Sequence, residues 1–432
     1  MTAKKLVQVT VQTVLAPLAL LIFVLGALLV RRDSMDRRRR RERPRLIYGP
    51  TPIISIKYMR EAMERAGYYA RTVVYSSLPI FSQSNYDYPL ESFFRSANAP
   101  SALRRAPSVI LGPYVVFLWS LRRFDVFHFF FDGGLLTGTP LRFLEVPLLH
   151  LAGKKVVVFP FGADVSALST IRSPEWRNGL VAHYPELAKR EKAILRQIRH
   201  FCRRADYVVA CIVHAESLPR WDLLTTLYYP IDADKWEPVP LSTGDRPVTI
   251  LHAPNHRIIK GTDFLVAACR ELEQEGVALE LRLVEGVPNE QLKTMLEAAD
   301  ILAEQFILGY ALAAVEGMSL GKPVLSNLSE DDYYEPHRRL TGLDECPIVS
   351  TTPDQIKDTL RTLVADKELR EEIGAKSRRY VLKYHSYPAM ARMWELVYRK
   401  VWLGDEIDLV AWHPDRVPEQ PVDAEPIESA AG

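Results

Sequence analysis

The sequence predicts an α/β protein built from two Rossmann-like, doubly wound domains and preceded by one N-terminal transmembrane helix. Short apolar runs alternate with amphipathic helical segments in two separate series, a pattern typical of parallel sheets covered by helices. A Pro-rich, polar stretch at residues 228–247 separates the two series. An uncharged apolar segment, Leu6 to Val30, stands near the start of the chain.

Length and composition agree with two domains. The chain has 432 residues and a hydrophobic content of 48%, enough to fill two cores. A formal net charge of +2 favours no class of partner by itself. The cysteines show neither metal-ligand nor disulfide-framework spacing, so we interpret them as reduced thiols. They are Cys202, Cys211, Cys269 and Cys346.

The N-terminal segment, residues 1–30, is predicted to be a membrane anchor. As a helix, Leu6 to Val30 would extend roughly 37 Å, enough to cross a bilayer with some tilt. A cleaved signal peptide is disfavoured, because Arg31 and Arg32 stand where a small-residue cleavage site would be. The basic linker that follows, residues 31–44, places the rest of the chain on the cytoplasmic face of a single-pass protein. Its arginines also suit anionic lipid headgroups, and this position beside the span argues against nucleic-acid binding.

The first α/β domain is predicted at residues 45–235. Its strands are expected within 45–52, the end of 53–75, 124–131, 154–165 and 205–213, with a basic helix at 184–204. The apolar stretch 107–121 lies between pairs of arginines and is short for a second span. We expect a buried helix there and keep a membrane-skimming surface helix as the alternative.

The second α/β domain is predicted at residues 245–403. We expect strands at 248–252, 279–284, 300–304 and 322–327, and helices at 262–275, 288–298 and 311–320. A last amphipathic helix begins near Pro388 and packs back onto the protein. The acidic, Pro-rich tail at 404–432 is predicted to be disordered.

The stretch "HAPNHRIIKGTD", residues 252–263, carries the first candidate site. Arg257 and Lys260 stand between a strand and a helix start, where the helix already presents positive partial charge. Cations fit this place if an anion such as a phosphate sits there too. The alternative is a solvated basic turn in which Thr262 and Asp263 cap the helix.

The second half of the chain resembles the nucleotide-sugar-binding domain of GT-B glycosyltransferases, nearest to the retaining, family 4-like branch. The resemblance rests on "HRIIKGTDFL" and "AADILAEQFILGYALAAVEGMSLGKPVLSN" and covers most of 245–400. It is fainter over 45–232, where "FDVFHFFFDG", "FPFGADV" and "YYPIDADKW" carry it. The resemblance implies a metal-independent, retaining hexosyltransferase. Its donor would be a nucleotide-diphosphate-sugar, with no further cofactor, and its acceptor a glycan or a lipid-linked glycan.

The resemblance also implies roles for individual residues. Lys260 and Arg257 would stabilise the diphosphate leaving group, and Glu316 would accept hydrogen bonds from the ribose hydroxyls. Asp164 would bind a sugar hydroxyl near the reacting carbon or, equally well on sequence grounds, cap the next helix. The remaining donor-binding candidates are Asn255, Gly261, Thr262, Gly309 and Tyr310.

Several positions depart from the family pattern. Leu308 stands in place of a glutamate, Ala311 in place of a glycine, and Phe161 in place of a histidine. Asn255 occupies the place of the family's arginine, and Arg257 substitutes for it only if the loop path differs. These departures favour a second hypothesis, a catalytically inactive GT-B-like scaffold subunit of a glycan assembly complex. A sugar-nucleotide epimerase is the weakest reading, because such enzymes usually lack a membrane span.

Two further polar groups have ambiguous roles. Glu304 and Gln305 would supply polar contacts to the donor sugar, although spacing alone does not establish this. His128 lies in an apolar strand, where a histidine is more often a satisfied core residue than a functional one.

Overall fold

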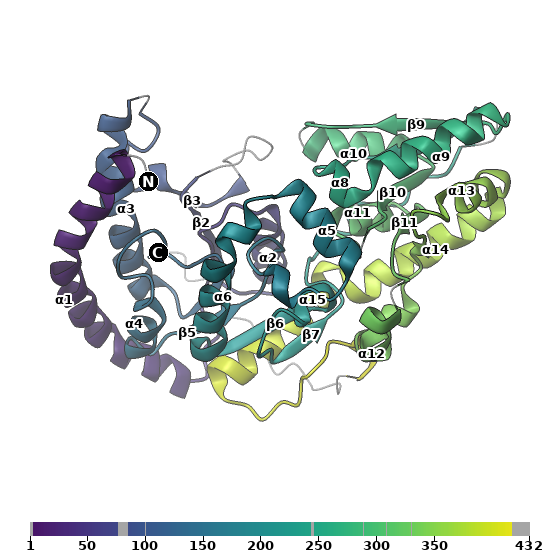
Figure 1. The fold of residues 1–432 in the computed structure, drawn as a ribbon. Coiled ribbons are helices and arrows are strands. Elements are labelled where there is room, and N and C mark those ends of the chain that lie inside the picture. The colour runs from purple at the N-terminus through teal and green to yellow at the C-terminus, as the bar shows by residue number, and fades with distance from the viewer. Residues whose placement is uncertain are drawn as a thin grey trace.

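The computed structural model describes residues 3–76, 85–99, 101–242, 246–287, 289–307, 309–329 and 331–416. These residues form two α/β domains with a long N-terminal helix along the outside of the first (Figure 1). Each domain contains one parallel sheet with helices packed against it, so the predicted fold class is confirmed.

The N-terminal domain contains a parallel sheet with the strand order β3-β2-β1-β4-β5-β6-β7. The strands are β1 (Leu46–Tyr48), β2 (Ala70–Val74), β3 (Tyr88–Pro89), β4 (Val126–Phe129), β5 (Lys155–Val158), β6 (Tyr207–Cys211) and β7 (Leu223–Thr225). The central strands are buried along their whole length, which explains their continuous apolar runs. They are shorter than predicted at 124–131 and 154–165, because those runs continue into buried loops.

Helices cover both faces of this sheet. They are α2 (Ile54–Arg65), α3 (Ala102–Arg123), α4 (Glu145–Leu151), α5 (Pro174–His183), α6 (Leu187–Arg204) and the short α7 (Ile212–Ala215). The buried side chains of α3, α4 and α6 share one core on one face of the sheet. The buried side chains of α2 belong to a second core on the opposite face. The stretch 107–121 is therefore part of α3, with its inner face buried as expected.

The C-terminal domain contains a smaller parallel sheet with the order β12-β11-β10-β8-β9. Its strands are β8 (Val248–His252), β9 (Leu279–Leu283), β10 (Ile301–Gln305), β11 (Val324–Ser326) and β12 (Val349–Ser350). Its helices are α8 (Arg257–Lys260), α9 (Thr262–Gln274), α10 (Asn289–Ala298), α11 (Leu312–Ser319), α12 (Asp331–Thr341), α13 (Ile356–Ala365) and α14 (Lys367–Tyr384).

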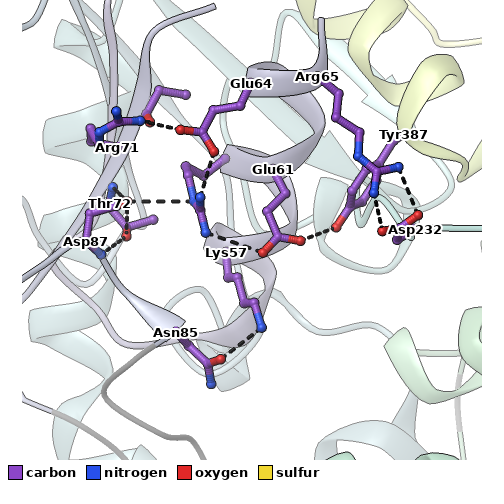
Figure 2. A network of polar contacts seen from close by, with 12 residues as sticks. Lys57, Glu61, Glu64, Arg65, Arg71, Thr72, Asn85, Asp87, Asp232 and Tyr387 are labelled. Atoms are coloured by element: carbon purple, nitrogen blue, oxygen red, sulfur yellow. Dashed lines mark hydrogen bonds and ion pairs between the residues drawn. The ribbon is translucent and has the colours of Figure 1, made fainter. Parts of the chain in front are cut away.

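The last helix, α15 (Tyr387–Tyr398), joins the N-terminal domain. Its apolar residues lie in the same core as α2, on the sheet face opposite α3. A hydrogen bond from Tyr387 to Glu61 at 2.8 Å reinforces this packing, and Arg65 of α2 pairs with Asp232 of the segment between the domains (Figure 2). The expected polar linker is thus partly packed, since Trp236 is buried in the core of the C-terminal domain.

Helix α1 (Ala3–Arg39) continues through much of the predicted basic linker. By length and composition, its segment Leu6–Arg39 is able to cross a membrane. It packs against α3 and α4 along the outer side of the N-terminal domain (Figure 1). Two of its arginines serve the fold: Arg37 bonds the buried Asp125 at 3.3 Å, and Arg38 bonds the carbonyl of Gly153 at 2.8 Å.

The beginning of the tail corrects the prediction of disorder. Leu409 and Trp412 are buried. In edge strand β7, the amide of Leu224 donates to the carbonyl of Val410 at 2.8 Å, and the carbonyl of Leu224 accepts from the amide of Trp412 at 2.7 Å. An edge strand offers unpaired backbone groups, and two apolar side chains in a polar tail suffice to hold the segment there. Residues 417–432 lie outside the described residues.

Candidate functional site

The loop after β8 forms a glycine-hinged turn at the carboxyl edge of the sheet. Gly261 has φ +70°, ends α8 and precedes α9, so the helix start predicted at residue 262 is confirmed. A Cβ at Gly261 would lie 3.1 Å from the Cβ of Phe306, so both the backbone angle and the space favour glycine.

Thr262 does not cap the helix, contrary to the alternative reading. Its hydroxyl lies 2.9 Å from Nε2 of the buried His252. Nδ1 of His252 lies 2.7 Å from the carbonyl of Ala303 and therefore carries the proton, which leaves Nε2 to accept from Thr262. Burial lowers the pKa of His252 to about 4, which keeps the imidazole neutral. Sequence analysis missed this histidine, although its place at the end of a strand was a usable signal.

Lys260 points inward from the turn. Its ammonium contacts Glu304 and lies 2.9 Å from Oε1 of Gln305, both at the end of β10. The residue is 8% exposed and Glu304 is 3% exposed. Glu304 and Gln305, expected near the donor sugar, are therefore partners of the lysine in this structure.

Arg257 points the other way, which corrects the expected pair of inward-facing cations. Its guanidinium bonds Asp263 and Glu285, each at 3.1 Å, and its side chain is 43% exposed. Asn255 is also exposed, in the bend before α8. The reason is local: carboxylates of α9 and of the loop after β9 lie on the outer side of the turn and attract the arginine.

Glu316 lies at the centre of α11 and is 2% exposed. The helix approaches the sheet closely at the next residue, because a Cβ at Gly317 would lie 2.6 Å from Leu302 and 3.3 Å from Val324. The "EGM" part of the motif thus combines a buried carboxylate with the glycine that lets its helix pack.

A backbone hydrogen bond holds the segment before α11 in place. Gly309 has φ +71° and donates to the carbonyl of Asn327 at 2.8 Å. Tyr310, predicted to bind the donor, has its ring in the core with its hydroxyl 3.5 Å from His385, so its side chain is a core group here. Ala311 precedes α11 with an extended backbone that does not require glycine. Leu308 lies outside the described residues.

In the N-terminal domain, Asp164 organises the loop after β5. Its carboxylate accepts from the amides of Phe161 and Gly162, and its second oxygen accepts from Phe131 after β4. Burial, and then the charge of Asp132, raise the pKa of Asp164 to about 7. Asp164 therefore caps its own loop instead of a following helix.

Asp132 is a candidate that sequence analysis missed. It follows β4, and the hydroxyl of Thr51, from the loop after β1, lies 2.9 and 2.8 Å from its two oxygens. Desolvation by the surrounding protein raises the pKa of Asp132 to about 6, even though the residue is reached by solvent. A carboxylate at the carboxyl end of a parallel strand was a usable signal, since ligands bind there in open α/β sheets.

His128 is a core residue, and Phe161 packs partly buried against the core that contains α2 and α15. His128 donates from Nδ1 to the carbonyl of Ile47 at 3.2 Å and accepts from the hydroxyl of Tyr398 at 3.1 Å. The ring of Phe161 packs edge-on against Phe130. The expectation of a satisfied core histidine at residue 128 is confirmed.

The strand-end loops of the two domains meet. The hydroxyl of Tyr184, after α5, lies 2.7 Å from Nε2 of His256, directly before Arg257. A Cβ at Gly309 would lie 3.0 Å from Val213, after β6. The glycine-hinged turn, the start of α11 and the N-terminal domain therefore border one interface.

A possible metal site lies elsewhere. Glu345, His413 and Asp415 come close enough to share a cation, but Lys383 already pairs with both carboxylates at 2.7 and 2.5 Å. The lysine supplies the positive charge that a metal would bring, so these residues do not fit a metal.

No protein-family model and no curated protein matches the sequence. Among solved structures, the chain is similar to Alr3699/HepE of Anabaena in complex with UDP-glucose, with 12% identity and a TM-score of 0.51 over 83% of this chain and 100% of that one. The same protein with UDP and glucose gives 12% identity and a TM-score of 0.50 over 82% and 99%. With two parallel sheets whose strand ends face each other, the chain has the GT-B fold.

Proposed function

We propose that the protein is a membrane-attached glycosyltransferase that transfers a sugar from a nucleotide-diphosphate-sugar to a glycan or lipid-linked acceptor. The observation that carries the proposal is the turn at 257–262, which brings a buried lysine and a helix start to the domain interface of a GT-B fold. The fold's likeness to a protein solved with UDP-glucose supports the same ligand class.

The donor diphosphate would sit at the start of α9. Helix N-termini favour anions, and the ammonium of Lys260 is the cation nearest this turn that is directed inward. As the glycosidic bond breaks, negative charge grows on the diphosphate, and Lys260 would stabilise it without a metal. Because Lys260 contacts Glu304, the donor must share the ammonium with that carboxylate.

Glu316 would hold the nucleoside. Two ribose hydroxyls match the two oxygens of a carboxylate, and a buried position strengthens such bonds. Transfer with retention of configuration is proposed on the motif resemblance alone.

Membrane attachment is proposed through α1, with the α/β domains on the cytoplasmic side. Its apolar length supports attachment, and the arginines that follow it suit the anionic lipids of the cytoplasmic leaflet.

Calorimetric titration of the full chain in mild detergent with UDP, GDP and ADP tests the proposal. We expect one nucleotide to bind, and Glu316→Gln and Lys260→Met to weaken its binding at least about tenfold, because each removes a charged hydrogen-bond partner. Lys376→Met, on the exposed face of α14, is the matched control and leaves binding unchanged. Absence of nucleotide binding by folded protein refutes the proposal.

A catalytically inactive scaffold subunit is the second candidate. It is favoured by the ion pair of Lys260 with Glu304 and by the outward direction of Arg257, which leave less free positive charge at the turn. Nucleotide binding without hydrolysis or transfer of any bound sugar would select this candidate.

A further inference from the structure

The outward face of α1 is a continuous apolar stripe. Its exposed side chains recur every three or four residues and cover six turns of the helix. They are Val7, Val11, Val14, Leu18, Leu21, Leu25 and Leu28, with Leu6, Ile22 and Leu29 beside them. Exposed apolar area of this extent marks a partner or a membrane.

The inward face of α1 is fixed to the N-terminal domain. The buried Gln12 donates its side-chain amide to the carbonyl of Ile110 at 3.2 Å, in the turn of α3 that Pro113 interrupts. Because Pro113 lacks an amide proton, the carbonyl of Val109 one turn back loses its helical donor, and the side-chain amide of Gln12 also lies 3.5 Å from that carbonyl. Phe23 packs on Phe117 at 4.8 Å between ring centres.

These contacts hold α1 along most of its length. They run from Gln12 to Arg38, which bonds the carbonyl of Gly153. A helix packed in this way along a water-exposed domain cannot also stand upright across a bilayer. Crossing would require α1 to leave the domain and expose both Gln12 and the broken turn of α3 to lipid.

Helix α6 carries a second unusual face. Lys192, Arg196, Arg199 and Arg203 recur at spacings of four, three and four residues, so they form one basic stripe along the helix. Together with Arg204 they line a groove of about 570 Å³. Throughout the described parts of the chain, no carboxylate forms an ion pair with any of the four stripe residues. Like charges at these spacings destabilise a helix unless an anion compensates them.

The apolar stripe and the basic stripe belong to the same side of the molecule. Helices α3, α4 and α6 cover one face of the sheet, and α1 lies over α3 and α4 (Figure 1). Phe143, two residues before α4, has its ring centre 5.1 Å from that of His200 on α6 and borders the basic groove. Arg32, Arg39 and Arg40 add exposed positive charge at the end of α1.

We propose that this side of the N-terminal domain docks on an anionic bilayer, with α1 lying in the plane of the interface and the basic stripe of α6 binding lipid phosphates. An apolar helix face beside unpaired arginines matches the boundary between acyl chains and anionic headgroups. A nucleic acid would match the cations but not the apolar face, and a protein groove would have to match both. The inference builds on the proposed membrane attachment and does not depend on sugar transfer.

Depth measurements on α1 test its orientation. Nitroxide labels are placed on cysteines that replace Val7, Leu18 and Leu29 one at a time, in the full chain with Cys346→Ser, since the other three cysteines are buried. Positions eleven residues apart share one helix face. In vesicles containing phosphatidylglycerol we expect all three labels at similar depth. In a crossing helix, the label at residue 18 would lie about 16 Å deeper than the other two, and that result overturns the proposal.

A competition between two vesicle populations tests the basic stripe. Full-length protein is mixed with phosphatidylcholine vesicles and with vesicles that also contain phosphatidylglycerol, and its distribution between them is measured. The comparison cancels the apolar contribution of α1. Each cation near an anionic surface contributes about fivefold. Arg196→Gln/Arg199→Gln/Arg203→Gln should therefore reduce the preference for anionic vesicles by up to about a hundredfold.

The matched control removes three exposed arginines of the C-terminal domain, Arg270→Gln/Arg339→Gln/Arg379→Gln, and leaves the preference unchanged. Equal loss in both triple variants means that net charge alone acts, and it refutes the role of α6. An unchanged preference in the α6 variant refutes it as well. Nucleotide titration of the same samples reports separately on the proposed enzymatic site.

Discussion

The pair of Lys260 and Glu304 allows a quantitative test of the candidate site. Both side chains are nearly buried, with 10% and 1% of their surfaces exposed. Replacing Lys260 by methionine leaves the Glu304 carboxylate buried, with the hydroxyl of Ser326 at 3.4 Å still donating to it. Removing one partner of a buried ion pair costs about 3–5 kcal/mol, so Lys260→Met should lower the free energy of unfolding by that amount.

The reverse change is expected to be milder. In Glu304→Gln, Lys260 keeps Oε1 of Gln305 at 2.9 Å and a route to solvent, so the loss should be about 1–2 kcal/mol. The double variant Lys260→Met/Glu304→Gln should be more stable than Lys260→Met alone, with a coupling energy of about 1–3 kcal/mol.

Urea unfolding in mild detergent, followed by tryptophan fluorescence, measures these differences. The exposed pair of Lys376 and Glu372 on α14 is the control, and its disruption should leave the unfolding midpoint unchanged. The same variants report on the proposed function: Glu304→Gln releases the ammonium for the diphosphate and should tighten nucleotide binding. A loss below about 1 kcal/mol in Lys260→Met, or weaker nucleotide binding by Glu304→Gln, would refute the reasoning.

Three further predictions follow from the same contacts. Gly261→Ala should lower stability by about 1–2 kcal/mol, measured by urea unfolding, because φ is +70° and the new Cβ would meet Phe306 at 3.1 Å; Gly276→Ala, also at positive φ but with open space, isolates the steric part. Arg257→Ala should leave nucleotide affinity unchanged in calorimetry, since the guanidinium faces Asp263 and Glu285, and a tenfold loss would restore Arg257 to the site. In the folded protein the pKa of Asp164 is about 7, above its ordinary value of 3.8, so the folded state binds one more proton between these pH values and the free energy of unfolding should fall as pH rises from about 4 to 7. Asp164→Asn should reduce this dependence of the free energy of unfolding on pH, measured by urea unfolding at several pH values, and an unchanged dependence would contradict the raised pKa.

The fold was predictable because strand and helix periodicities are local properties. Buried parallel strands such as β4 and β6 read as continuous apolar runs, and α9 begins at the residue that its pattern indicates. The position of α1 was not predictable in the same way. An uncharged apolar segment fits a crossing helix and a packed helix equally, and what distinguishes them is the contact of Gln12 with a turn of α3 that lies far away in sequence.

In the candidate site, too, local sequence predicted some features and contacts between distant segments decided others. Motif order brought Lys260, Gly261 and Glu316 into consideration, and the structure places all three at one edge of the C-terminal sheet. The direction of Arg257 depends on Asp263, which lies within the motif, and on Glu285, which arrives from a different loop and is not part of the motif.

The N-terminal domain connects the proposed glycosyltransferase site with the proposed membrane-docking side. Asp132 and Asp164 lie at the carboxyl ends of β4 and β5, while α4 and α6, which connect these strands onward, form the proposed docking side. One sheet therefore links the docking side to the domain interface. A bilayer that holds α6 flat fixes the height of the strand ends above the lipid. A lipid-linked acceptor is the substrate class for which such a fixed height matters, because its reactive group stands at a set distance from the membrane. A soluble glycan would gain nothing from it. If the α6 triple variant loses transfer to a lipid-linked acceptor in vesicles but keeps it in detergent, docking positions the acceptor; equal loss in both would show that the variant harms the site itself.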